Sequence, residues 1–82
     1  MRTPVRDVPV REDGIRLGQL LKLAGLVDNG SDVKVLLERG LVTVGGRPET
    51  RRGRQLRGGE VVAVGDERVR VVVQPTVVEP TD

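Results

Sequence analysis

The sequence contains no cysteine, no histidine and none of the aromatic residues phenylalanine, tyrosine and tryptophan. Without thiols and imidazoles, it has no disulfides, thiolate nucleophiles, histidine bases or metal sites with sulfur or nitrogen ligands. Without aromatic rings, only the guanidinium plane of an arginine could stack on a nucleic-acid base. These absences exclude most catalytic chemistry and every ring-stacking mode of base recognition.

Long apolar stretches are also missing. No apolar run approaches the ~20 residues that a membrane helix needs, and the N-terminal stretch MRTPVRDVPV lacks the apolar core of a signal peptide. A chain of 82 residues forms one small domain at most. Its apolar residues are nearly all valine and leucine, each contributing about 1.5–3 kcal/mol when buried. We therefore expect a cytoplasmic, monomeric protein with a modest core and no membrane contact.

Two segments have the apolar spacing of amphipathic helices. Residues 15–24 are predicted to form the first helix, and Gly25 is suited to end it. The second helix is predicted to begin at Ser31, whose side chain suits an N-cap, and to end at Gly40. The two apolar stripes consist of Leu17, Leu20, Leu21 and Ala24, and of Val33, Leu36 and Leu37. Together these segments predict a helical hairpin.

From residue 41 onward the pattern is that of strands. Residues 41–44, 61–64 and 68–73 are predicted strands, and Gly45-Gly46 can supply the positive φ angles of a two-residue hairpin turn. Residues 49–50 are predicted to form a weak return strand, and the rest of 47–60 an exposed loop. The N-terminal extension, residues 1–13, contains a possible edge strand at 8–10, where proline is tolerated. Residues 74–82 are predicted to be a flexible tail, which leaves residues 14–73 as the α+β domain.

Charge is concentrated in one part of the chain. The overall net charge is only +2, but residues 47–57 contain five arginines and a single acid, Glu49. The arginines are Arg47, Arg51, Arg52, Arg54 and Arg57. Arginine presents a planar fork of donors that suits phosphate oxygens, so the cluster indicates a polyanion site. The alternative is a solvated loop that keeps the protein soluble.

Three polar residues of the predicted helices could extend this basic cluster. Lys22 and Lys34 lie on the polar sides of the two helices, where either could reach a second row of phosphates. The alternative for Lys34 is an ion pair with Glu38 one turn later, worth about 0.2–0.5 kcal/mol. For Ser31, a helix cap and a phosphate contact are compatible roles.

Other motifs argue against catalysis. Gly45-Gly46 is not a nucleotide-binding loop, because no Gly-Lys-Ser/Thr and no helix follow it. The adjacent acids Glu12-Asp13 and Asp66-Glu67 are flanked by glycine and are more simply turn formers than a general acid–base pair. We therefore expect no catalytic residue, no metal, no cofactor and no small-molecule substrate.

The order of the elements and the letters themselves resemble a known family. The residues that carry the resemblance are Leu17-Gly-Gln-Leu-Leu-Lys-Leu-Ala-Gly-Leu-Val, then Ser31, then Gly40-Leu-Val-Thr-Val-Gly-Gly, Glu49-Thr-Arg-Arg-Gly-Arg and Leu56-Arg-Gly-Gly-Glu-Val-Val. Over about residues 14–73 the chain resembles the S-four-like (S4-like) RNA-binding domain, named after the fourth protein of the small ribosomal subunit. It resembles in particular the small stand-alone bacterial members of the YbcJ type.

This resemblance implies a fold and a function. The fold is a helical hairpin packed on a small bent antiparallel sheet. The function is binding of structured RNA, ribosomal or transfer RNA, in connection with the ribosome and translation. The RNA-binding surface implied by motif position comprises Lys22, Ser31, Lys34, Arg47, Thr50, Arg51, Arg52 and Arg54, to which charge alone adds Arg57. The alternative function is a protein-interaction adaptor whose basic loop binds an acidic partner.

Overall fold

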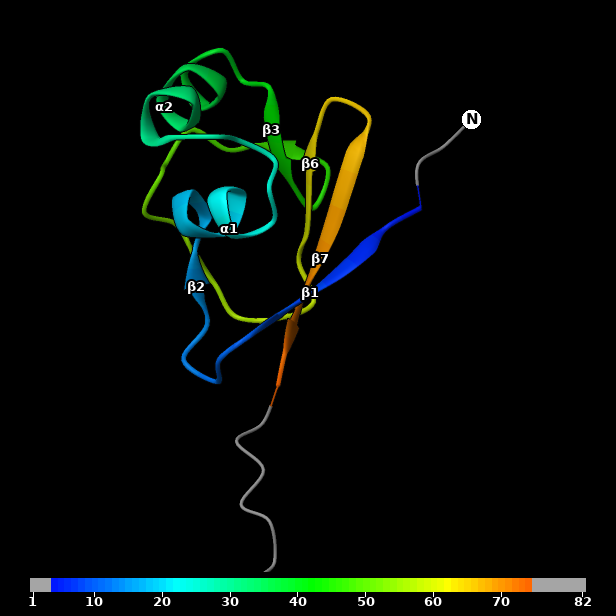
Figure 1. The fold of residues 1–82 in the computed structure, drawn as a ribbon. Coiled ribbons are helices and arrows are strands. Elements are labelled where there is room, and N and C mark those ends of the chain that lie inside the picture. Colours follow the sequence, from blue (N-terminus) through cyan, green and yellow to red (C-terminus); the bar gives the residue numbers. More distant parts are fainter. Residues whose placement is uncertain (1–3, 75–82) are drawn as a thin grey trace, which may run out of the picture.

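A computed structural model describes residues 4–74, and within them two helices pack on one side of a sheet (Figure 1). The helices are α1 (Leu17–Leu23) and α2 (Gly30–Glu38). The strands are β1 (Arg6–Val10), β2 (Ile15–Arg16), β3 (Val42–Val44), β4 (Arg47–Pro48), β5 (Gln55–Leu56), β6 (Val61–Val64) and β7 (Glu67–Val73). The main sheet has the order β1-β7-β6-β3-β4, and β2 pairs with β5.

The predicted α+β class is confirmed, with one difference in the sheet. The strand pairs β3–β4, β3–β6, β6–β7 and β2–β5 are antiparallel. The pair β1–β7 is parallel, from Arg6 opposite Val69 to Val10 opposite Val73. The sheet is therefore mixed, because the N-terminal strand joins it along β7.

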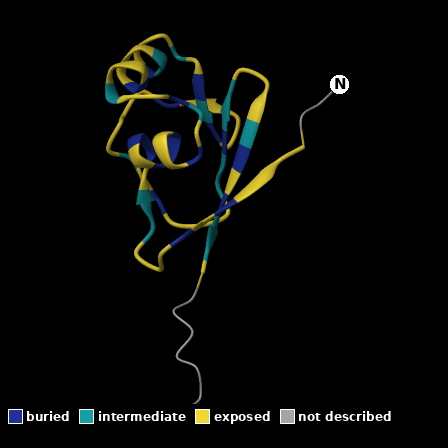
Figure 2. Ribbon diagram, in the orientation of Figure 1, coloured by how far each residue is buried: buried dark blue, intermediate teal, exposed yellow. Residues whose placement is uncertain are grey.

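The core lies between the helices and the sheet (Figure 2). Leu17, Leu20 and Leu21 of α1 are completely buried, and the sheet meets them with valines such as Val42 and Val62. At about 1.5–3 kcal/mol for each buried side chain, this aliphatic layer provides most of the stabilisation of the fold. The apolar stripe predicted for the first helix is thus its buried face.

The first helix begins later than predicted. Ile15 and Arg16 form β2 and pair with Leu56 and Gln55 of β5, so the helix begins at Leu17. A pairing with residues forty positions away overrides the local helical pattern. The predicted end is correct, because the chain leaves the helix through Gly25 at φ +73°.

The N-cap of the second helix lies two residues earlier than predicted. Asn29, not Ser31, is the N-cap, and its side-chain oxygen accepts a hydrogen bond from the Asp32 amide at 3.1 Å. Ser31 is therefore an exposed residue within the first turn. Gly40 follows the helix at φ +68°, as predicted.

The region between β3 and β6 differs most from the prediction. The turn at Gly45 and Gly46 has φ angles of 61° and 84°, as a tight hairpin requires. The return strand is β4, Arg47–Pro48, two residues before the predicted position. Residues 47–60 were predicted to be exposed apart from that strand, but Leu56 of β5 is completely buried in the core.

Strand β1 forms the outer edge of the main sheet. Val8 and Val10 are buried while Pro9 between them is exposed. The Val10 carbonyl accepts a hydrogen bond from the Gln74 amide at 2.9 Å. The Arg6 guanidinium donates to the Ala24 carbonyl at the end of α1. An edge strand is thus present where one was predicted, and it is fastened to both the sheet and a helix.

Two further expectations concern the C-terminal tail and membrane-spanning helices. The predicted flexible tail lies outside the described residues except for Gln74. None of the helices in residues 4–74 has the length and apolar character to cross a membrane.

Candidate nucleic-acid interface

The segment Glu49-Thr50-Arg51-Arg52-Gly53-Arg54, here called the arginine loop, is fixed to the start of α1 by its backbone. The amides of Leu17 and Gly18 donate to the carbonyls of Arg54 and Arg52 at 2.8 and 2.9 Å. The first amides of a helix have no partner within the helix, so the loop satisfies two of them. The loop and α1 therefore form one rigid unit, and in Figure 1 the chain after β4 runs along the outer side of the helices.

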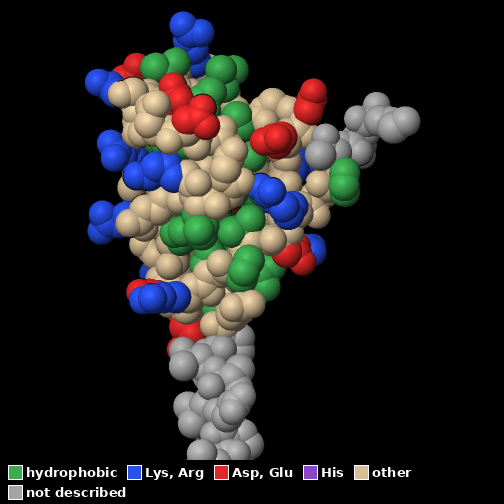
Figure 3. Space-filling model, viewed as in Figure 1, with side chains coloured by type: hydrophobic (Ala, Val, Ile, Leu, Met, Phe, Trp, Pro, Cys, Tyr) green, Lys and Arg blue, Asp and Glu red, His purple; other side chains and the backbone are tan. Residues whose placement is uncertain are grey.

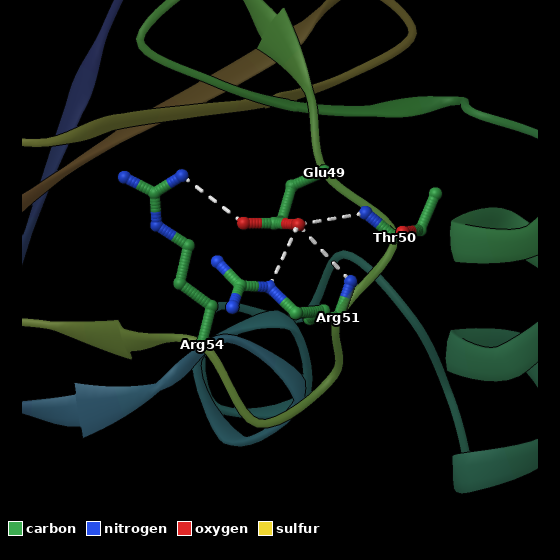
Figure 4. A network of polar contacts seen from close by, with 4 residues as sticks. All are labelled: Glu49, Thr50, Arg51 and Arg54. Atoms are coloured by element: carbon green, nitrogen blue, oxygen red, sulfur yellow. Dashed lines mark hydrogen bonds and ion pairs between the residues drawn. The ribbon is translucent and has the colours of Figure 1, made fainter.

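The side chain of Glu49 organises the inside of the arginine loop (Figure 4). This residue is only 8% exposed. One carboxylate oxygen accepts from the amides of Thr50 and Arg51 at 2.9 and 3.1 Å, and the other accepts from Arg54 Nη1 at 3.1 Å. The Arg51 Nε lies 3.7 Å from the first of these oxygens. A single carboxylate thus holds two backbone amides and two guanidinium groups.

These contacts favour the ionised form of Glu49. The hydrogen bond from the Arg51 amide is the largest cause of a lowered pKa, and burial opposes it. The Arg54 side chain, the Thr50 amide and the Arg51 charge lower the pKa further. The net shift is downward, so Glu49 stays charged at neutral pH and the contacts within the loop are charge-assisted.

Arg52 has a different environment from Arg51 and Arg54. Its side chain lies across the first turn of α1: a Cβ built on Gly18 would be 2.9 Å from Arg52 Cγ. The Arg52 side chain can lie this close to the helix only because residue 18 has no side chain. Within residues 4–74 the Arg52 guanidinium has no ion pair, and the residue is exposed.

A second carboxylate shapes the chain just after the loop. Glu60 accepts hydrogen bonds from the amides of Arg57 and Gly58 at 2.8 and 2.7 Å. Burial opposes ionisation of Glu60, but these two amides, the backbone amide of Glu60 itself and the Arg54 charge outweigh it and lower its pKa. The backbone at Arg57 is therefore fixed while its guanidinium remains exposed.

The other predicted site residues lie on neighbouring elements. Lys22 is in the last turn of α1, Ser31 and Lys34 are on α2, and Arg47 is in β4; all four are exposed. Lys34 lies 4.0 Å from Glu38, so the ion pair considered from the sequence is present, at the limit of contact. In Figure 3 lysine and arginine side chains follow the left margin, where Figure 1 has α2, α1 and the chain between β4 and β5.

The structure brings together Thr50, Arg51 and Arg54 around Glu49, and it sets Arg52 against α1. The basic cluster is partly neutralised, because Glu49 pairs with two of its arginines. Residues 47–60 still contain five arginines against two glutamates, a net charge of +3. A shallow hollow, here called the loop hollow, is lined by Arg51, Gly53, Arg54 and Gln55.

Sequence reasoning missed two residues that shape this surface, Glu49 and Gly18. The available signal for Glu49 was its position as the one acid among five arginines. For Gly18 it was a glycine inside a helical pattern, a position that costs about 1 kcal/mol relative to alanine and therefore needs a packing reason. Neither signal shows which residues Glu49 and Gly18 contact in the folded chain.

Within residues 4–74, no three acidic or metal-binding side chains gather in one place.

Comparison with known proteins gives three agreeing results. A family model of the S4 domain matches residues 8–72. The probable ribosome maturation protein RlbA of Bacillus subtilis (strain 168) is 39% identical over 57 residues, which cover 70% of this chain and 80% of that protein. The solution structure of YbcJ from E. coli, described as revealing an αL motif involved in RNA-binding, matches with a TM-score of 0.65 at 28% identity. That match covers 85% of this chain and 90% of YbcJ. The chain is therefore a member of the S4 domain family, as its motifs predicted.

Proposed function

We propose that this protein binds structured RNA through a surface formed by the arginine loop and the outer faces of the two helices. The observation that carries the proposal is the anchoring of the loop: its backbone is bonded to Leu17 and Gly18 of α1, and its inside to Glu49. Rigid guanidinium groups lose less conformational entropy on binding than mobile ones. A basic loop that only kept the protein soluble would not need this anchoring.

The proposed contacts are to the RNA backbone. The residues assigned to this surface are Lys22, Ser31, Lys34, Arg47, Thr50, Arg51, Arg52, Arg54 and Arg57. The sequence has no aromatic ring to stack on an extruded base, so recognition depends on phosphates and on the shape of a folded RNA. The surface involves no catalytic step.

The proposed target is ribosomal RNA, with transfer RNA as the second candidate, and the proposed setting is the cytoplasm. Support comes from the two relatives: RlbA is named as a probable ribosome maturation protein, and YbcJ is described with a motif involved in RNA-binding. The protein would act there as a monomer, docking beside RNA that is already folded.

The test is a titration of a fluorescently labelled RNA hairpin at several salt concentrations. With about 4–6 phosphate contacts, the logarithm of the association constant should fall against the logarithm of salt concentration with a slope of about −3 to −5. Arg52→Ala should weaken binding of every structured RNA tested, because it removes a phosphate contact. The matched control is Arg70→Ala, since Arg70 pairs with Asp7 at the opposite edge of the sheet. A slope near zero, or equal effects of the two variants, would contradict the proposal.

A second experiment separates RNA from an acidic protein as the partner. In a native extract the protein should sediment with large particles, and ribonuclease treatment should release it. Association that survives ribonuclease would favour the adaptor function instead.

A further inference from the structure

We infer that Glu49 is a positioning residue for RNA binding, although its charge has the same sign as the ligand. It holds Arg51 and Arg54 so that both present donors to one phosphate at the loop hollow. The inference rests on the proposed function. Net charge alone would predict that loss of an acidic side chain strengthens RNA binding, whereas a positioning role predicts the opposite. Removing this negative charge should weaken RNA binding.

Arg51 and Arg54 each keep N–H donors that do not contact Glu49. Arg54 uses Nη1 and Arg51 uses Nε in the contacts to Glu49, and a guanidinium has five N–H donors in a fixed plane. Both arginines also line the loop hollow beside Gly53, which contributes no side chain there. Gln55, the fourth lining residue, is itself held by a 2.9 Å hydrogen bond to the Asp13 carbonyl. The loop hollow is therefore lined by two cationic side chains, Arg51 and Arg54, and by Gln55, whose position is fixed by its hydrogen bond.

A buried carboxylate at this position has two opposing effects on a bound phosphate. Its charge repels the phosphate, but that repulsion is reduced because two guanidinium groups and two amides surround the carboxylate. Its second effect is to restrict Arg51, whose side chain is 78% exposed and otherwise free to rotate. A free arginine side chain carries about 2 kcal/mol of rotamer entropy, which has to be lost on binding. The restriction outweighs the screened repulsion.

The experiment compares two glutamates with opposite expected effects. Glu49→Gln removes the charge that orients the two arginines. Glu38→Gln is the matched control, because Glu38 is exposed and lies beside Lys34 on the proposed RNA surface. With an RNA hairpin as the probe, Glu49→Gln should bind about fivefold to tenfold more weakly than the unmodified protein. Its salt slope should be shallower by about one to two, as expected for lost phosphate contacts. Glu38→Gln should bind equally well or more tightly.

A further variant separates positioning from a loss of folding. Arg54→Lys keeps the charge and a contact to Glu49 but loses the planar fork, so it should weaken binding by a similar factor. Circular dichroism and urea unfolding establish that each variant is folded at the assay temperature. Tighter binding by Glu49→Gln, or unchanged binding by Arg54→Lys, overturns the inference. If Arg52→Ala and added salt also leave binding unchanged, the proposed function itself fails, so the two failures are distinguishable.

Discussion

Replacing Gly18 by alanine should separate the stability of the domain from its RNA affinity. Gly18 is buried in the first turn of α1, and an added Cβ would lie 2.9 Å from Arg52 Cγ, closer than non-bonded carbon atoms normally approach. The next contacts, Arg52 Nε and the Arg52 carbonyl, would be at an ordinary 3.4 Å. The Arg52 side chain is therefore the part that has to move.

The size of the two effects follows from this contact. On a fixed backbone the position of Cγ is set by χ1 alone, so relief of the clash requires rotation about χ1, which moves the whole guanidinium group. Alanine is favoured over glycine in helices by up to about 1 kcal/mol, so the free energy of unfolding should stay level or rise by up to that amount. Loss of one charged contact should weaken RNA binding about threefold to tenfold and reduce the magnitude of the salt slope by about 0.9.

The assay pairs urea unfolding with the RNA hairpin titration, and Gly30→Ala is the control. Gly30 is the first residue of α2, and a Cβ there would meet no atom within 4 Å, so RNA affinity should be nearly unchanged and the free energy of unfolding should not fall. Unaltered affinity in a stable Gly18→Ala variant would refute the assigned position of Arg52. If Gly18→Ala lowered the free energy of unfolding by more than about 1 kcal/mol, the loop backbone and not the Arg52 side chain would be the part that moves.

Three other predictions test the fold and its electrostatics. Leu56→Ala should lower the free energy of unfolding, measured with urea, by about 2–5 kcal/mol. Leu23→Ala, at a residue that is 61% exposed, should change it by less than about 0.5 kcal/mol. Similar values for the two variants would contradict the burial of Leu56 in β5. Asp7→Asn should cost at most about 1 kcal/mol and less in high salt, because its ion pair is solvent-exposed; a cost independent of salt would count against a screened pair. The lowered pKa of Glu49 means that its ionisation stabilises the fold above the ordinary pKa of a glutamate, and that this contribution is lost as the pH falls through the lower value. The difference in unfolding free energy between the unmodified protein and Glu49→Gln should therefore be constant from pH 7 to pH 5 and shrink in stronger acid, and a difference that grew on acidification would have the wrong sign.

The sequence predicts the parts of the fold that depend on local patterns. The leucines of α1 follow the spacing of an amphipathic helix, and its buried face is the predicted one. The valine-rich strands β3, β6 and β7 lie within one residue of their predicted bounds. The glycines that end the helices and form the β3–β4 turn have positive φ angles, which glycine adopts at no steric cost. These features need no knowledge of distant residues.

The parts that were not predicted depend on partners far along the chain. Ile15 joins a strand only because Leu56 is there to pair with it, and a lone buried leucine between polar residues has no periodicity to reveal it. Asn29 and Ser31 are both good N-caps, so side-chain type alone does not decide between them. Glu49 has the composition of a loop residue, and its burial depends on amides and guanidinium groups that converge only in the folded chain. The charge pattern indicates which segment is basic, but it does not predict the contacts among the side chains of that segment.

The outer edge of strand β1 is poorly suited to pairing with a strand of another copy. The Val10 carbonyl accepts from the Gln74 amide, directly after β7, so by alternation the backbone groups of Asp7 and Pro9 point away from the sheet. Proline has no N–H, so within residues 4–74 the outer edge of β1 lacks a donor at Pro9. A strand from another copy would leave one of its own carbonyls unpaired there, which disfavours growth into fibrils.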